Sequence, residues 1–98
     1  MPANYYSTAV SFTLGEVVMT QGIQALLDGR PEALLRPLLL RHESGDWGEC
    51  DIEDKKANDV ATRRGGRIVS VYRFSGQRVW LITEAGHQLT TVLLPSEY

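Results

Sequence analysis

The sequence lacks most of the features that point directly to a function. Cys50 is the only cysteine, so the chain cannot form an internal disulfide, which suits a reducing compartment. There is no run of about 18 apolar residues, and the first residues lack the basic start and long apolar stretch of a signal peptide. We therefore expect a cytoplasmic protein without membrane contact.

Charge and length set two further limits. The formal net charge is −2 at pH 7, which provides no overall attraction to nucleic acid, so such binding would need a local basic patch. A chain of 98 residues is expected to form one domain, residues 1–98, whose core needs neither a metal nor a disulfide. No cofactor-binding motif is present, and we expect no cofactor.

The stretch from Arg67 to Leu94 is rich in β-branched and aromatic residues and predicts a three-stranded antiparallel meander. The turns are expected at Ser75-Gly76 and Gly86-His87, because glycine supplies the positive φ that two-residue hairpin loops need. The opposed pairs that follow are Arg67 and Glu84, Ile68 and Thr83, Ser70 and Leu81, Tyr72 and Val79, Trp80 and Leu93, Leu81 and Val92, and Thr83 and Thr90.

Alternation along these strands divides the meander into two faces. The first face carries no charge and is expected to form the core; its residues are Ile68, Ser70, Tyr72, Phe74, Val79, Leu81, Thr83, Thr90, Val92 and Leu94. The second face has an apolar centre inside a charged border, which is typical of an interface. We predict that this centre is covered, either by residues 5–14 or in a homodimer; it comprises Val69, Val71, Trp80, Ile82 and Leu93.

The first half of the chain predicts cover for the sheet. Residues 9–19 alternate like one bent strand or two short ones at the edge of the meander. Thr20 is a capping residue for a helix that begins at Gln21 and ends at Asp28-Gly29. Residues 31–43 predict a second helix, kinked or broken near Pro37. The residues expected to pack on the sheet are Leu34, Leu35, Leu38 and Leu39.

Residues 51–64 predict a third helix, with acidic residues in its first turn, Arg63 and Arg64 in its last, and Gly65 or Gly66 after its end. Its few apolar residues, Ile52, Ala57, Val60 and Ala61, predict a narrow contact on the surface. The predicted fold class is α+β: an antiparallel β-meander of three C-terminal strands, with one or two N-terminal strands added, covered by two to three helices.

Several motifs from His42 onward occur in a recognisable combination. They are H-x-x-G-D-W-G at His42 to Gly48, D-x-E-D-x-x-x-N at Asp51 to Asn58, G-x-R-I-x-S-x-Y at Gly65 to Tyr72, W-x-I-T-E at Trp80 to Glu84, and T-T-x-L-L-P-x-E-Y at Thr90 to Tyr98. Together they resemble a group of small uncharacterised proteins of bacterial plasmids and integrated elements, often labelled plasmid-related and sometimes type I restriction subunit M-like. The resemblance implies a mobile-element context and no particular activity.

Candidate chemical residues are few. His42 lies near Asp46, Glu49 and Asp51 in the sequence, but this spacing matches no recognised metal site, so a helix-end histidine is the favoured interpretation. Trp47, between two glycines, predicts a plug at the edge of the core rather than an exposed recognition residue. Cys50 would need a base to act as a nucleophile, and only His42 is near it in the sequence, so catalysis by Cys50 is not favoured.

The only basic concentration has two interpretations; it consists of Arg63, Arg64, Arg67, Arg73 and Arg78. In one, these residues form a nucleic-acid patch on which Tyr72 or Trp80 stacks a base. In the other, which we favour, they form a solvated rim in which Arg67 pairs with Glu84.

Two functions are therefore considered. Helices before an antiparallel meander are similar to the barnase, EndoU, colicin and RelE-like ribonuclease architecture, which implies a small toxin or RNA-binding domain. There, His42 would be the general base, Arg67 or Arg73 would stabilise the phosphorane, and Thr83 or Thr90 would position the phosphate. The favoured hypothesis is a non-catalytic interaction or accessory protein of a bacterial mobile element, because no pair of nucleophile and base is visible. Its second face would bind a protein partner.

Overall fold

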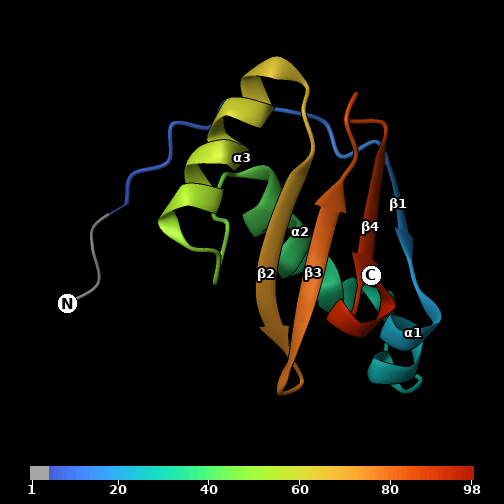
Figure 1. The fold of residues 1–98 in the computed structure, drawn as a ribbon. Coiled ribbons are helices and arrows are strands. Elements are labelled where there is room, and N and C mark those ends of the chain that lie inside the picture. Colours follow the sequence, from blue (N-terminus) through green and yellow to red (C-terminus); the bar gives the residue numbers. More distant parts are fainter. Residues whose placement is uncertain (1–4) are drawn as a thin grey trace.

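The computed structural model describes residues 5–98 and confirms the α+β fold (Figure 1). Its mixed sheet has the strand order β1-β4-β3-β2, in which β2, β3 and β4 form the antiparallel meander and β1 is parallel to β4. The strands are β1 (Glu16–Met19), β2 (Ile68–Phe74), β3 (Gln77–Thr83) and β4 (Leu89–Leu93). The α-helices are α1 (Gln21–Leu27), α2 (Arg36–Glu43) and α3 (Ile52–Arg64), and the 3₁₀ helices are η1 (Glu32–Leu35) and η2 (Pro95–Glu97).

The meander has the predicted register. The pairs between β2 and β3 and between β3 and β4 are those expected from the two turns. Ser75 and Gly76 both have positive φ, 51° and 77°, as the two-residue hairpin loop requires. The second turn is longer than the predicted two residues, because the last hydrogen bond before it runs from the Glu84 amide to the carbonyl of Leu89, where β4 begins. The turn is longer by one residue on each side, so the residues that face each other in β3 and β4 are those predicted.

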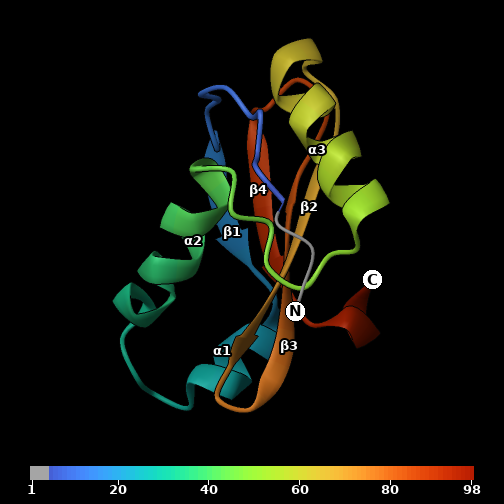
Figure 2. The same ribbon diagram turned by 90° about the vertical axis from the view of Figure 1, so that its left-hand side faces the viewer.

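The first face of the sheet forms the core, as predicted, and packs against helices (Figure 2). The cluster contains Ile23, Leu27, Leu35, Leu38, Tyr72, Val79, Leu81 and Val92, with Leu39 partly buried against it. Leu35 is 2% exposed but Leu34 is 43% exposed, so the predicted core position of Leu34 is wrong. The predicted break at Pro37 explains this: residues 32–35 form the tighter 3₁₀ helix η1, which turns Leu34 away from the sheet.

The N-terminal part differs from the predicted strand. Residues 9–14 form no strand, and the first strand is β1. We call residues 5–14 the strap; it passes between α2 and α3 (Figure 2). Gly15, with a φ of 67°, turns the chain from the strap into β1, where a Cβ would lie 2.1 Å from the Gln88 carbonyl carbon. The strap forms no strand: near its start the Thr8 and Val10 amides bond to α3 side chains, and near its end the Leu14 carbonyl accepts a hydrogen bond from Thr90.

α3 has the predicted ends but a different buried side. Asp51 accepts a hydrogen bond from the Asp54 amide at the start, and Gly65 ends the helix with a φ of 79°. Ile52 and Val60 are exposed, which corrects the predicted apolar contact, whereas the buried residues are Asn58, Asp59, Ala61 and Thr62. α3 lies against the edge of the sheet, where the Asn58 amide donates to the Val69 carbonyl at 2.8 Å and accepts from the Val69 amide at 3.1 Å. An open strand edge needs polar partners, which explains the polar side of this helix.

Within residues 5–98, no helix has both the length and the apolar character that crossing a membrane requires.

Candidate functional site

The second face of the sheet is partly covered by the chain itself. Ile82 is 3% exposed and Leu93 is 5% exposed. The Tyr98 ring packs edge-on against Trp80, with 5.4 Å between ring centroids, and its hydroxyl accepts a hydrogen bond from Arg67 at 2.6 Å. The cover predicted from residues 5–14 is therefore wrong, because the strap binds α3 and the C-terminal end takes its place. The homodimer stays a prediction.

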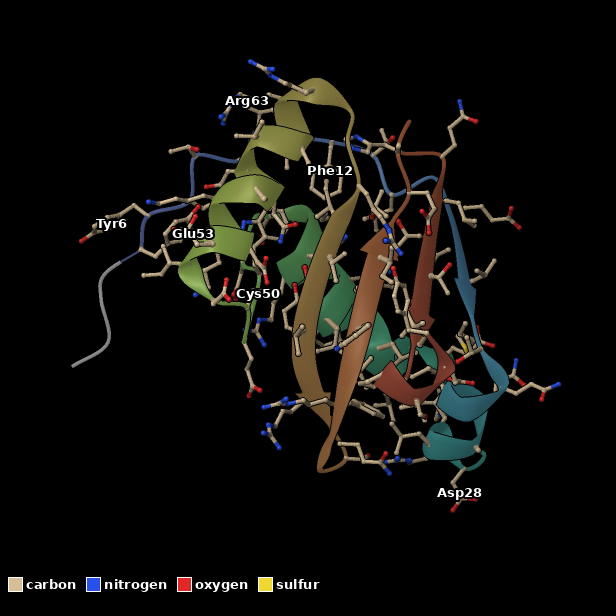
Figure 3. All side chains as sticks on the ribbon, viewed as in Figure 1. Tyr6, Phe12, Asp28, Cys50, Glu53 and Arg63 are labelled. Carbon is tan, nitrogen blue, oxygen red and sulfur yellow. The ribbon has the colours of Figure 1, made fainter. Side chains whose placement is uncertain are left out.

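The rest of the predicted interface forms the floor of a groove. Val69, Val71 and Trp80 are half-buried and line a cavity of about 560 Å³ between α3 and the second face. Ala57 and Asn58 of α3 contribute to its wall. Figure 3 shows Cys50 on the loop that leads into α3, beside β2. The groove is thus an apolar strip of sheet with a helix along one side.

Charge is distributed unevenly around this groove. Glu49 is engaged by two arginines, Arg73 at 3.0 Å and Arg78 at 3.5 Å. Arg67 is engaged by Glu84 at 3.5 Å. Within residues 5–98, the Asp54 carboxylate has neither an ion pair nor a hydrogen bond. The helix wall therefore carries a negative charge that no cation of the described residues pairs with.

Cys50 lies in the groove wall but is not activated. Its thiol donates to the Val69 carbonyl at 3.4 Å. Burial, together with the nearby charge of Asp54, raises the pKa of Cys50, so the thiol is protonated near neutral pH. His42, the base that the sequence suggested, bonds to other residues. The structure does not bring a nucleophile and a base together here.

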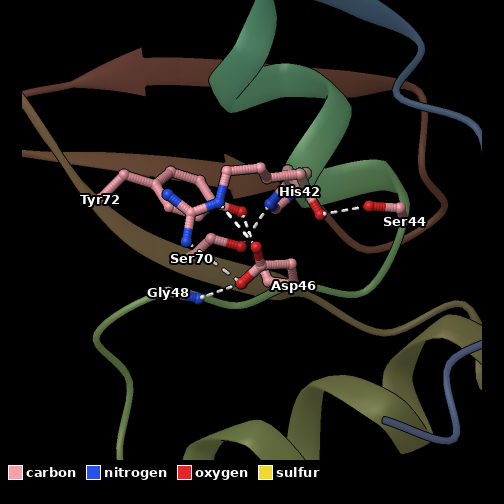
Figure 4. A network of polar contacts seen from close by, with 7 residues as sticks. His42, Ser44, Asp46, Gly48, Ser70 and Tyr72 are labelled. Atoms are coloured by element: carbon pink, nitrogen blue, oxygen red, sulfur yellow. Dashed lines mark hydrogen bonds and ion pairs between the residues drawn. The ribbon is translucent and has the colours of Figure 1, made fainter.

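His42 is fully buried and belongs to a chain of hydroxyl groups in the core. Its Nδ1 lies 2.5 Å from Ser70 Oγ, and its Nε2 lies 2.8 Å from Thr83 Oγ1 (Figure 4 shows the Ser70 side). Thr83 Oγ1 lies 2.7 Å from Thr90 Oγ1, which donates to the Leu14 carbonyl at 2.7 Å. His42 does lie in the last turn of α2, as the favoured interpretation predicts, and its ring is buried in the core.

The acids near His42 in sequence do not approach its ring. Asp46 instead pairs with Arg41 at 2.7 Å and accepts from the Gly48 amide (Figure 4). The hydrogen bond from Arg41 is the main cause that lowers the pKa of Asp46. In the part of the chain that the structure describes, no group of three or more His, Cys, Asp or Glu side chains is placed to hold a metal ion.

The residues of the ribonuclease hypothesis are only partly brought together. His42, Thr83 and Thr90 are in contact, but all three are fully buried on the first face. Arg67 and Arg73 belong to the second face, so they point away from the histidine. Burial, followed by the nearby His87, lowers the pKa of His42 to about 4. A phosphate cannot reach this neutral imidazole while it lies in the core.

The predicted basic residues do not form one patch. Arg67 and Arg73 are at opposite ends of β2, roughly 20 Å apart along a strand. Arg63, at the end of α3, donates to the Thr8 carbonyl at 2.8 Å, while Arg64 is exposed. The ion pair of Arg67 with Glu84 is the one expected for a solvated rim.

Sequence reasoning missed Asp59 as an organising residue. It is buried in α3 and accepts hydrogen bonds from Tyr5, from Ser7 at 2.9 Å and from the Thr8 amide at 3.0 Å. Trp47 Nε1 also donates to it at 2.8 Å, and Trp47 is buried as predicted. Nothing in the local pattern distinguishes Asp59 from the exposed aspartates of the same helix.

Comparison with known proteins provides no further assignment. No protein-family model matches the chain, and neither a curated protein nor a solved structure matches it. The resemblance to plasmid and integrated-element proteins stays a prediction, and the function has to be argued from the geometry above.

Proposed function

We propose that this chain is a small non-catalytic interaction protein that binds a short segment of a protein partner in the groove between α3 and the second face. The observation that supports this most is the half-buried floor of Val69, Val71 and Trp80, which stays open beside the unpaired carboxylate of Asp54. An apolar floor with a few polar groups at its border is the usual composition of a binding site. In the mobile-element context, the partner is a host or element-encoded protein in the bacterial cytoplasm.

The chemistry of the groove indicates the kind of segment that it accepts. An apolar side chain would cover the floor, where Trp80 provides the largest contact surface. A neighbouring lysine or arginine would pair with Asp54, whereas an acidic residue there would be repelled. Arg73 and Arg78 do not reverse this preference, because neither lines the groove and Glu49 neutralises one of their two charges. The expected partner segment therefore combines an apolar anchor with a positive charge.

Peptide display provides a direct test. Random peptides are selected on the wild-type protein and on Val71→Arg, which places a long charged side chain on the floor. Val17→Arg is the matched control, because Val17 is an exposed strand valine on β1, outside the groove. We expect peptides with an apolar residue next to Lys or Arg to be enriched on the wild type and on Val17→Arg, and to be lost on Val71→Arg.

A second variant tests the charge separately. Asp54→Asn removes the unpaired carboxylate and leaves the floor intact, so selection on this variant should keep the apolar residue and lose the Lys or Arg preference. Peptides that bind Val71→Arg as well as they bind Val17→Arg would contradict the proposal. A selection that yields no binding peptide would contradict it too.

A further inference from the structure

The strap is held at its C-terminal end by the residues around His42. The Phe12 ring lies between His42 and His87, with centroid distances of 5.7 Å and 5.3 Å, and it also approaches Trp47 at 6.3 Å. The Leu14 carbonyl is bound by Thr90. Residues 9–14 have no helix or strand of their own, so these contacts and those of Asp59 keep the strap in place.

The hydrogen bonds around His42 run in one direction only. The Leu14 carbonyl can only accept, so Thr90 donates its single hydroxyl hydrogen there. Thr83 must then donate to Thr90, and His42 Nε2 must donate to Thr83. Nδ1 is left as an acceptor for the Ser70 hydroxyl. The closed strap thus requires a neutral His42 with its proton on Nε2.

A second proton on His42 would have no carboxylate among the described residues to stabilise it. It would sit on Nδ1 and face Ser70 Oγ, 2.5 Å away, whose hydroxyl would have to turn its own hydrogen away from the ring to accept it. No carboxylate within residues 5–98 bonds to this imidazole: Asp46 is held by Arg41, and Asp59 by Trp47 and the strap. The remaining ionisable neighbour is His87, beyond Phe12, and its charge would add repulsion. A buried cation without a partner is strongly destabilising.

We propose that His42 is a proton-operated latch for the strap: protonation releases residues 5–14 from the globule while the sheet stays folded. When Phe12 leaves, water reaches the His42 ring, and the ring then takes up a proton with the ordinary histidine pKa of about 6.5. In the closed state, burial and then His87 lower its pKa to about 4. The open state therefore binds the proton more tightly, and falling pH favours opening. Linkage predicts that the opening equilibrium at about pH 5 is about twentyfold larger than at neutral pH.

Amide hydrogen exchange of the full chain, measured by NMR and corrected for the intrinsic pH dependence, tests this latch. We expect the Thr8 and Val10 amides, which bond to Asp59 and Thr62, to open about twentyfold more at about pH 5 than at about pH 7. Amides paired between β2 and β3 should change much less. His42→Gln, which cannot ionise, should remove the pH dependence of the strap. His87→Gln is the matched control and should keep most of the pH dependence of strap opening.

Two further measurements decide the matter if His42→Gln does not fold. Thr90→Val removes the donor to Leu14 and should open the strap about tenfold more at about pH 7, with little change in the sheet. The Hε1 resonance of His42 in the wild type should titrate well below that of an ordinary histidine. Loss of protection in strap and sheet at the same pH, a normal His42 titration, or an unchanged pH dependence in His42→Gln would each overturn the proposal.

Discussion

Asp59 carries a buried negative charge that is stabilised by neutral donors rather than by a cation. Burial alone would raise its pKa, but the hydrogen bonds from the Thr8 amide, Tyr5, Trp47 and Ser7 outweigh burial and lower it. Burial and, after it, the Asp59 carboxylate raise the pKa of Tyr5 to about 12. One residue therefore joins the strap, the loop before α3 and α3 itself.

Replacing this carboxylate should be costly. Asp59→Asn keeps the size of the side chain but turns one acceptor into a donor that faces other donors, so we expect a loss of about 2 to 4 kcal/mol in the free energy of unfolding. Asp54→Asn in the same helix is the control and should cost less than about 1 kcal/mol, mainly through the helix dipole. Urea denaturation near neutral pH measures both. Equal losses would mean that Asp59 is not the joining residue.

The pH dependence of this contribution has a definite sign. Because the pKa of Asp59 is lower in the folded protein, its stabilisation is present above the ordinary aspartate pKa of about 3.9 and is lost as the pH falls through the lowered value. The His42 latch operates at higher pH, since its window starts near an ordinary histidine pKa of about 6.5. The two groups are thus distinguishable in one acid titration.

At the scale of the elements, Pro37 decides how the segment after α1 meets the sheet. It lies in the first turn of α2, where its missing amide hydrogen leaves no intrahelical bond unmade, and the preceding residues form η1 instead of a continuous helix. The break changes which leucines point inward. Leu35 and Leu38 enter the core, while Leu34 faces solvent.

Two neighbouring leucines provide a matched test of this break. Leu35→Ala should reduce the free energy of unfolding by about 2 to 5 kcal/mol, through lost burial and the cavity left behind. Leu34→Ala is the same chemical change one residue earlier and should cost less than about 1 kcal/mol, because the side chain is already exposed. Thermal or urea unfolding distinguishes them. A larger loss for Leu34 would indicate one continuous helix through Pro37.

At the scale of the whole molecule, both the faces and one edge of the sheet are partly occupied. β2 is one of the two edge strands, and its outer side bonds to the Asn58 side chain and to the loop before α3: the Val71 amide donates to the Trp47 carbonyl at 3.2 Å, and the Glu49 amide donates to the Val71 carbonyl at 2.8 Å. Such cover protects an edge from pairing with other chains. On the second face, α3 and the Tyr98 end leave the groove open.

This cover predicts that the chain is a monomer in solution. Ile82 and Leu93 are already buried, and a three-residue concave floor offers far less than the roughly 800 Å² per partner of a stable interface. Light scattering at micromolar concentration measures the mass. A dimer that Trp80→Asp abolishes would contradict this expectation and support the homodimer instead.

The order of residues alone determined several helix ends and the register of the meander. Ser75-Gly76 permits only a tight hairpin, and from that turn the period of two assigns each strand residue to a face. The start of α1 and both ends of α3 follow from Thr20, Asp51 and Gly65, whose capping chemistry acts over a few residues. These interactions are local, so they can be recognised without the fold.

Only the tertiary structure decided which polar residues lie inside and which apolar ones stay accessible. His42 is buried because Ser70 and Thr83 satisfy its ring, and Thr90 finds its acceptor in Leu14, 76 positions away. Burying a polar group is costly unless its partners are in place, and those partners come from distant strands and from the strap. The same holds for the groove, since Tyr98 covers one end of the second face and leaves the other open. Local pattern cannot specify either outcome, because each depends on contacts between segments that meet only in the folded chain.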